Sequence, residues 1–163
     1  MTTRARTVIR LIVWVGLSLL AGGIGSIASA NAREFYSQLV KPGWSPPGSV
    51  FGPVWTTLFI LMGVAAFLIA QSPPSRQRRI ALITFVVQLV LNALWSWIFF
   101  AWRLGAGAFV EIIVLWLVIA ATIVMFARIH KLAAVLLVPY LAWVTFATAL
   151  TWAIWQLNPT LLR

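Results

Sequence analysis

The sequence of 163 residues has no cysteine, two acidic residues and a single histidine. The absence of cysteine excludes disulfide bonds, thiolate metal ligands and cysteine nucleophiles. With His130 as the only histidine, a haem held by two histidines is also excluded. No general acid–base pair or conventional nucleophile arrangement is present. We therefore expect no metal site and no resident cofactor.

Charged residues are scarce, at 9% of the chain against roughly a quarter in soluble globular proteins. Apolar residues make up 63% and occur in long blocks of the kind that form membrane-spanning helices. Five blocks cover residues 8–30, 50–71, 79–101, 105–128 and 132–157. The sequence predicts an all-α, polytopic membrane protein: one domain over residues 1–163, a five-transmembrane-helix bundle in the lipid bilayer with a long structured first loop.

The first apolar block has an alternative interpretation as a secretory signal peptide. Arg4, Arg6 and Arg10 precede it, and the small-residue stretch "ASANA" at its end is typical of a cleavage site. The apolar run is longer than most signal cores, so we favour a retained first span.

Small residues recur at a four-residue spacing in the same block, as in Gly22, Ser26 and Ala30, and in Gly25 and Ser29. This spacing allows close approach of a second helix. The neighbour is either another helix of the bundle or a dimer partner, and we favour packing within the bundle.

The net charge of +10 comes from basic residues between the apolar blocks, so we read it as a topology signal and expect no nucleic-acid partner. Five spans put the termini on opposite sides of the membrane. The N-terminal side carries eight of the twelve basic residues, namely Arg4, Arg6, Arg10, Arg76, Arg78, Arg79, Arg128 and Lys131. The positive-inside rule therefore predicts a cytoplasmic N-terminus and a first loop outside.

The first loop, residues 30–49, is rich in rigid residues. It contains "KPGWSPPGS", and "AREFYSQL" before it can form a short helix. Pro42, Pro46 and Pro47 restrict the conformations of the loop and so lower the entropic cost of ordering it. We expect a stiff lid that holds Trp44 and Tyr36 over the mouth of a cavity.

The ten tryptophans are distributed unevenly, and a symmetric aromatic belt does not explain them. Seven lie on the side of the first loop: Trp44, Trp55, Trp95, Trp97, Trp102, Trp152 and Trp155. Helical spacing gathers aromatic and amide residues into three stripes: Trp55, Phe59, Met62 and Ala66; Gln88, Asn92, Trp95 and Phe99; Trp143, Ala147, Leu150 and Ile154. Two interpretations are open, packing between helices and a site for a flat apolar ligand. We favour the site, because indoles are bulky and carry a donor that needs a partner. The amides of Gln88 and Asn92 should face protein, since an amide in lipid is costly.

Several motifs resemble the TspO/MBR family of tryptophan-rich sensory and translocator proteins over the whole chain. They are "KPGWSPPGSVFGPVWTTLFILMG", "LNALWSWIFF" and "PYLAWVTFATALTWAIWQLN". The resemblance implies five transmembrane helices, a homodimer, and a ligand cavity closed by the first loop. It implies porphyrins, other tetrapyrroles or drug-like aromatic compounds as ligands. The residues implied in binding are Tyr36, Pro46, Trp55, Phe59, Asn92, Trp95, Trp143, Ala147 and Ser26.

The resemblance leaves the function between three alternatives. The first is a receptor- or sensor-like binder of porphyrins. The second is an enzyme that degrades porphyrin under light, with Trp55 and Trp143 as catalytic residues. The third is a small transporter of tetrapyrroles with Glu111 as its coupling group. Sterol binding is doubtful, since Trp152 and Gln156 replace the tyrosine and arginine of the animal sterol segment.

Two ionisable residues invite a functional interpretation. Glu111 lies inside the fourth apolar block, where acids are candidates for function. We favour a structural role for it, either paired with Arg103 or exposed at the interface. His130 lies in the "IHK" connection, across the membrane from the expected cavity, and should be an interfacial residue.

Overall fold

The computed structural model describes residues 3–30 and 32–163, and the part of the chain that it describes is helical without strands. The elements are α1 (Thr3–Ala28), α2 (Ala32–Gln38), η1 (Gly48–Val50), α3 (Phe51–Gln71), α4 (Arg76–Ser96), η2 (Trp97–Ala101), α5 (Gly105–Ala127) and α6 (Lys131–Leu157). Five helical segments of 23 to 27 residues are long and apolar enough to cross a membrane. The predicted all-α bundle with five transmembrane helices is confirmed.

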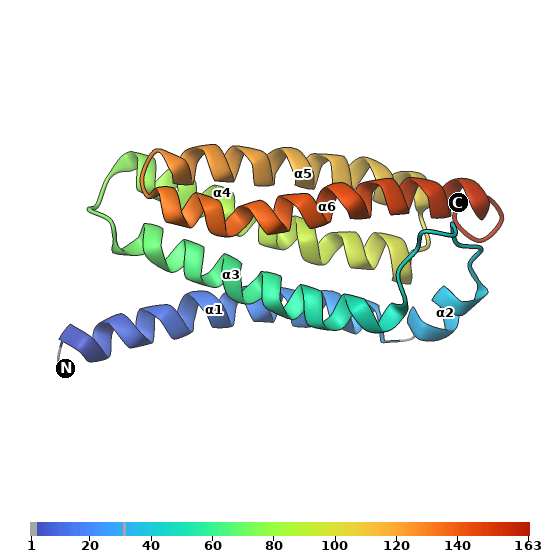
Figure 1. Ribbon diagram of the computed structural model, residues 1–163, viewed down its shortest axis with the longest axis horizontal. Coiled ribbons are helices and arrows are strands. Elements are labelled where there is room, and N and C mark those ends of the chain that lie inside the picture. Colours follow the sequence, from blue (N-terminus) through green and yellow to red (C-terminus); the bar gives the residue numbers. More distant parts are fainter. Residues whose placement is uncertain (1–2, 31) are drawn as a thin grey trace.

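The five long helices lie side by side (Figure 1). Helix α1 packs against α3 and α4, while α5 packs against α4 and α6, and α3 also contacts α6. The N-terminus and the α3–α4 connection lie at one end of the bundle, and α2 and the C-terminus lie at the other (Figure 1). The termini are therefore at opposite ends, as an odd number of spans requires.

The helices extend beyond the apolar blocks on the side with the most basic residues. Helix α1 begins at Thr3 and α4 at Arg76, rather than at residues 8 and 79. The side chain of Ser75 caps α4 by accepting a hydrogen bond from the Arg78 amide at 3.1 Å. Hydropathy marks the part of a helix that meets lipid, whereas its end depends on capping.

The first loop contains more regular structure than its composition indicates. Helix α2 covers most of "AREFYSQL", and the 3₁₀ turn η1 leads directly into α3. Between the end of α2 and the start of η1, only residues 39–47 lack helical structure. A hydrogen bond of 3.0 Å between the Tyr36 hydroxyl of α2 and the Ser45 Oγ ties this stretch to the helix.

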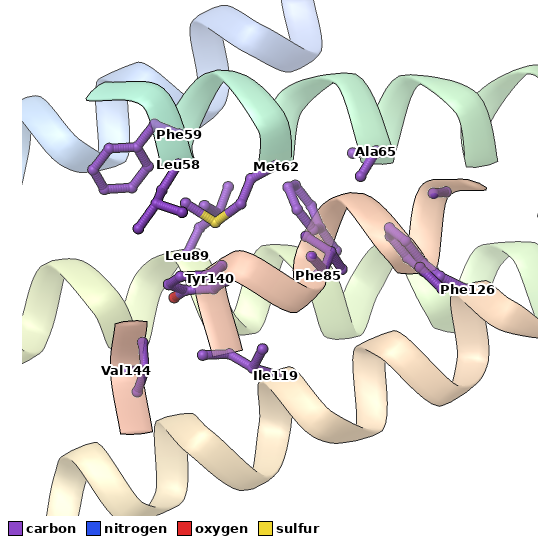
Figure 2. Packing of buried hydrophobic residues seen from close by; sticks show 14 of the residues in the cluster. Leu58, Phe59, Met62, Ala65, Phe85, Leu89, Ile119, Phe126, Tyr140 and Val144 are labelled. Atoms are coloured by element: carbon purple, nitrogen blue, oxygen red, sulfur yellow. The ribbon is translucent and has the colours of Figure 1, made fainter. Parts of the chain in front are cut away.

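The centre of the bundle is a cluster of buried apolar side chains from α3, α4, α5 and α6. Figure 2 shows part of it, with Met62 of α3 directed toward Leu89 of α4 and Tyr140 of α6. One polar network lies inside this cluster. The Asn92 Nδ2 donates to the Tyr140 hydroxyl at 2.9 Å, and that hydroxyl donates to the Gln88 Oε1 at 2.9 Å. Both amides face protein, as predicted, with Gln88 1% and Asn92 7% exposed.

Glycine residues allow α1 to pack closely against α3 and α4. A side chain at Gly63 would collide with the backbone of Val15, and one at Gly22 would collide with the ring of Phe59. A Cβ at Gly25 would lie 3.1 Å from the Ser96 Oγ. Gly22 and Gly25 therefore pack inside the bundle, in line with the favoured alternative, whereas Ser26 and Ala30 are exposed. Helix α1 is an integral part of the fold; Asn31, in the stretch that resembles a cleavage site, lies outside the described residues.

Candidate ligand-binding cavity

A cavity of about 1070 Å³ lies at the end of the bundle that carries α2. Its wall is formed by α1, α3, α4, η2, α5, α6 and the first loop. The structure places all nine residues named as ligand-binding candidates on this wall: Ser26, Tyr36, Pro46, Trp55, Phe59, Asn92, Trp95, Trp143 and Ala147. Side chains far apart in sequence therefore line one space.

Aromatic rings form much of this wall, and they come from three of the long helical segments. On α3, Trp55 stacks on Phe59 with centroids 5.6 Å apart and an angle of 29° between the planes. On α4, Trp95 stacks on Phe99 of η2 at 5.0 Å and 14°. On α6, Trp143 makes an edge-to-face contact with Phe51, with the ring centroids 5.9 Å apart. Flat apolar surfaces therefore face the space from several sides.

Two buried indole N–H groups of the wall have no hydrogen-bond partner among the described residues, Nε1 of Trp95 and Nε1 of Trp143. Elsewhere in the bundle, by contrast, the Trp116 Nε1 donates to the Thr145 Oγ1 at 2.8 Å. A buried indole N–H usually finds an acceptor, because leaving it unpaired costs free energy. Both nitrogens are covered by neighbouring atoms, so a molecule in the cavity would reach these two donors only if the indole rings turned toward it.

Several residues of the cavity wall are exposed at the surface. They are Leu19, Gly23 and Ser26 of α1 and Gly52 and Thr56 of α3. Because α1 and α3 are neighbours, these residues mark an open side of the cavity between the two helices. Asn92 lies deeper, where its amide already binds the Tyr140 hydroxyl.

The first loop covers one part of the cavity, with Tyr36 but without Trp44. Tyr36, Pro42, Pro46 and Pro47 line the wall. Trp44 does not line the wall. This residue is 52% exposed, and its ring makes an edge-to-face contact with Phe146 of α6, with the ring centroids 5.8 Å apart. The turn at residues 43–44 places this ring outside the cavity. The expectation that Trp44 lies over the mouth is therefore wrong, and of the two aromatic residues expected there only Tyr36 lines the cavity.

The π-helical segment η2 adds Phe100 to the wall, which sequence reasoning missed, beside Phe99, which helical spacing places on the same face as Trp95. The Trp102 amide donates to the Trp97 carbonyl five residues earlier, at 2.9 Å. Phe99 and the adjacent Phe100 both line the cavity, with their rings in edge contact at 5.0 Å. A regular α-helical pattern does not reveal such a turn, although the pair of phenylalanines in "WIFF" was a signal. Ile112 and Leu115 of α5 were also missed, because they resemble ordinary core residues.

Glu111 is buried, with 8% of its surface exposed, and neither carboxylate oxygen has a hydrogen-bond partner among the described residues. Arg103 does not pair with it, because its guanidinium lies 4.7 Å from the ring centre of Phe35. Both expected roles, pairing with Arg103 and interfacial exposure, are therefore wrong. His130 lies in the α5–α6 connection and is not part of the cavity wall.

Comparison with known proteins extends these observations. The model of the TspO/MBR family matches residues 14–156. A tryptophan-rich protein TspO from Chlorobaculum tepidum is 41% identical over 156 residues, which cover 94% of this chain and 99% of that protein. A tryptophan-rich sensory protein from Cereibacter sphaeroides is 42% identical over 77% of each chain. The human translocator protein is 38% identical over 77% of this chain and 75% of its own.

Proposed function

The chain belongs to the TspO/MBR family and is an integral multi-pass membrane protein, and from this premise we propose that it binds porphyrins or other flat hydrophobic ligands as a receptor- or sensor-like protein. The observation that carries the proposal is the cavity of about 1070 Å³ walled by stacked aromatic rings. A relative named as a sensory protein fits a role in which the protein binds its ligand without converting or transporting it.

The chemistry of the wall supports a planar ligand with acceptor groups at its edge. Ligand pockets for drug-sized molecules have volumes of roughly 300–1,000 Å³, so this cavity is large enough for a macrocycle. Stacked rings such as Trp95 and Phe99 present flat faces. The unpaired N–H groups of Trp95 and Trp143 would suit carboxylate or carbonyl oxygens if the indole rings turned toward the ligand. No strong axial ligand is required, because shape and stacking would hold the macrocycle.

The test is a titration of the detergent-purified protein with protoporphyrin, read as quenching of tryptophan fluorescence. Quenching alone does not locate the ligand, so a variant that fills the cavity is needed. Ala147 lines the cavity, whereas Ala149 on the same helix is exposed and is not part of the wall. We expect Ala147→Phe to weaken binding about tenfold or more, because the added ring occupies ligand space at a cost of about 1–3 kcal/mol.

The matched control is Ala149→Phe, which adds the same ring on the lipid-facing side and should bind protoporphyrin as the original chain does. Absence of saturable quenching in the original chain would sink the proposal. Equal affinities for the two variants would place the ligand outside the cavity and would also contradict it.

The enzymatic alternative has one observation in its favour. Trp55 and Trp143, the residues expected to be catalytic, both line the cavity and would both lie near a bound macrocycle. Under illumination, Trp55→Phe and Trp143→Phe should then slow the loss of porphyrin absorbance. Loss at the rate of the original chain in both variants would remove the enzyme from consideration.

The transport alternative draws on the relatives named translocator protein. It depends on Glu111, which is buried but is not part of the cavity wall. The geometry therefore gives less support to coupled transport than to binding. We keep the homodimer as part of the proposal, since the family resemblance implies it.

A further inference from the structure

We propose that Asn158 is a positioning residue that latches the first loop to the end of α6 and so holds one wall of the cavity in place. Asn158 follows directly after α6 and is 4% exposed. It was not among the site residues expected from the sequence, and it does not line the cavity itself. Its effect is exerted through the residues that it binds.

The side chain of Asn158 makes three hydrogen bonds that join two distant segments. Its Oδ1 accepts from the Val40 amide at 2.8 Å, and its Nδ2 donates to the Val40 carbonyl at 2.8 Å. The same Nδ2 donates to the Ile154 carbonyl, one turn earlier on α6, at 2.7 Å. The carboxamide thus pairs with the loop backbone as a neighbouring strand would, using both its donor and its acceptor.

The two segments joined by this latch are both walls of the cavity. On the loop, Ser37 and Lys41 on either side of Val40 line the cavity. On α6, Thr151 and Ile154 line it directly before Asn158. The Asn158 side chain therefore lies where the loop wall meets the helix wall. Breaking its bonds to Val40 would free the loop without removing any residue that touches a ligand.

Asn158 is itself held firmly, so the loop is the part that can move. Its carbonyl accepts the amides of Leu161 at 3.1 Å and Leu162 at 2.9 Å, and Leu162 is 1% exposed. Arg163 then pairs with the α4–α5 connection, through its amide to the Arg103 carbonyl and its carbonyl to the Gly105 amide. The tail beyond α6 is thus fixed to the bundle. The loop segment at residues 39–47 has no helical structure of its own.

The first experiment measures hydrogen–deuterium exchange of the purified protein and needs no ligand. Asn158→Ala removes both bonds to Val40, while Asn158→Asp keeps the size and an acceptor but loses the donor. We expect amide exchange in residues 39–45 to rise about tenfold in Asn158→Ala and less in Asn158→Asp, with α3 to α6 unchanged. The control is Val40→Ala, which changes an exposed side chain but keeps both backbone partners of Asn158.

The second experiment measures the dissociation rate of protoporphyrin and rests on the proposed function. We expect dissociation from Asn158→Ala to be about tenfold faster, since the loop wall opens more often, and Val40→Ala to match the original chain. Faster loop exchange with unchanged dissociation would overturn the link to ligand retention. Unchanged loop exchange, or exchange raised equally in all helices, would overturn the latch.

The two proposals fail in different ways. If the original chain does not bind protoporphyrin, the proposed function is wrong, and the exchange measurement still decides the latch. If neither Asn158 variant folds, exchange of the original chain at single-residue resolution decides it. The Val40 amide should then exchange much more slowly than the amides of Lys41, Gly43 and Trp44, for which no hydrogen bond is found among the described residues. Equal exchange would show that Asn158 does not hold it.

Discussion

At the scale of single residues, the polar network inside the apolar core is the feature that depends most on complete hydrogen bonding. The Tyr140 hydroxyl lies between Asn92 and Gln88, accepting from one and donating to the other. Tyr140 is 1% exposed, so water cannot replace either bond. Asn92 also lines the cavity, which makes the network a link between bundle stability and the shape of the ligand site.

Replacing Tyr140 by phenylalanine should destabilise the protein by about 1–3 kcal/mol, because it leaves two buried amide groups unpaired. The measurement is denaturant or thermal unfolding in detergent. Tyr36→Phe is the matched control, since Tyr36 loses only its partly buried bond to Ser45 and should cost less. An equal loss of unfolding free energy in the two variants would show that the buried network contributes no more to stability than the Tyr36–Ser45 bond.

At the scale of secondary-structure elements, the contact between α1 and α3 depends on missing side chains. Gly63 of α3 lies so close to the Val15 backbone of α1 that no side chain fits between them. A Cβ added at Gly16, the next residue of α1, would meet no atom of another element within 4 Å. These two glycines of the same interface region thus have different physical roles.

Gly63→Ala should push α1 and α3 apart and destabilise the bundle by about 1–3 kcal/mol, the usual cost of overpacking. Gly16→Ala should be neutral or stabilising by up to about 1 kcal/mol, because alanine favours the helix and meets nothing. Both are measured by unfolding in detergent. A Gly63→Ala variant as stable as Gly16→Ala would contradict the close contact.

At the scale of the whole molecule, the arrangement in the membrane sets which solvent the cavity meets. Helix α2, whose Tyr36 and Ser37 line the cavity, lies at one end of the bundle, and the α3–α4 connection lies at the other (Figure 1). The distribution of basic residues, eight against four, is our reason to propose a cytoplasmic N-terminus and an outer first loop.

The natural absence of cysteine makes this orientation directly testable. Gln38 of α2 and Gln77 of α4 are both exposed and lie at opposite ends of the bundle. With intact cells and a membrane-impermeant thiol reagent, Gln38→Cys should be labelled at once, and Gln77→Cys only after lysis. The reverse pattern would invert the proposed orientation.

Much of the fold and the candidate site could be predicted because both depend on local patterns. Long apolar blocks form helices in lipid whatever their neighbours, since the backbone must satisfy its own hydrogen bonds. Helical spacing placed Trp55 with Phe59, and Asn92 with Trp95, on common faces, and the family motifs named the same side chains. Periodicity placed Phe99 with Trp95 but missed Phe100, which the π turn at η2 brings to the same wall.

The sequence by itself determined the membrane class, the five spans and the aromatic character of the site, because hydropathy and helical period act over short distances along the chain. Only the tertiary structure decided the positions and contacts of Trp44, Glu111 and Asn158. Trp44 turns outward onto Phe146, Glu111 is buried without Arg103, and Asn158 binds Val40 across 118 positions of the chain. Each depends on which distant segment lies opposite, and that is set by how the helices and connections pack together.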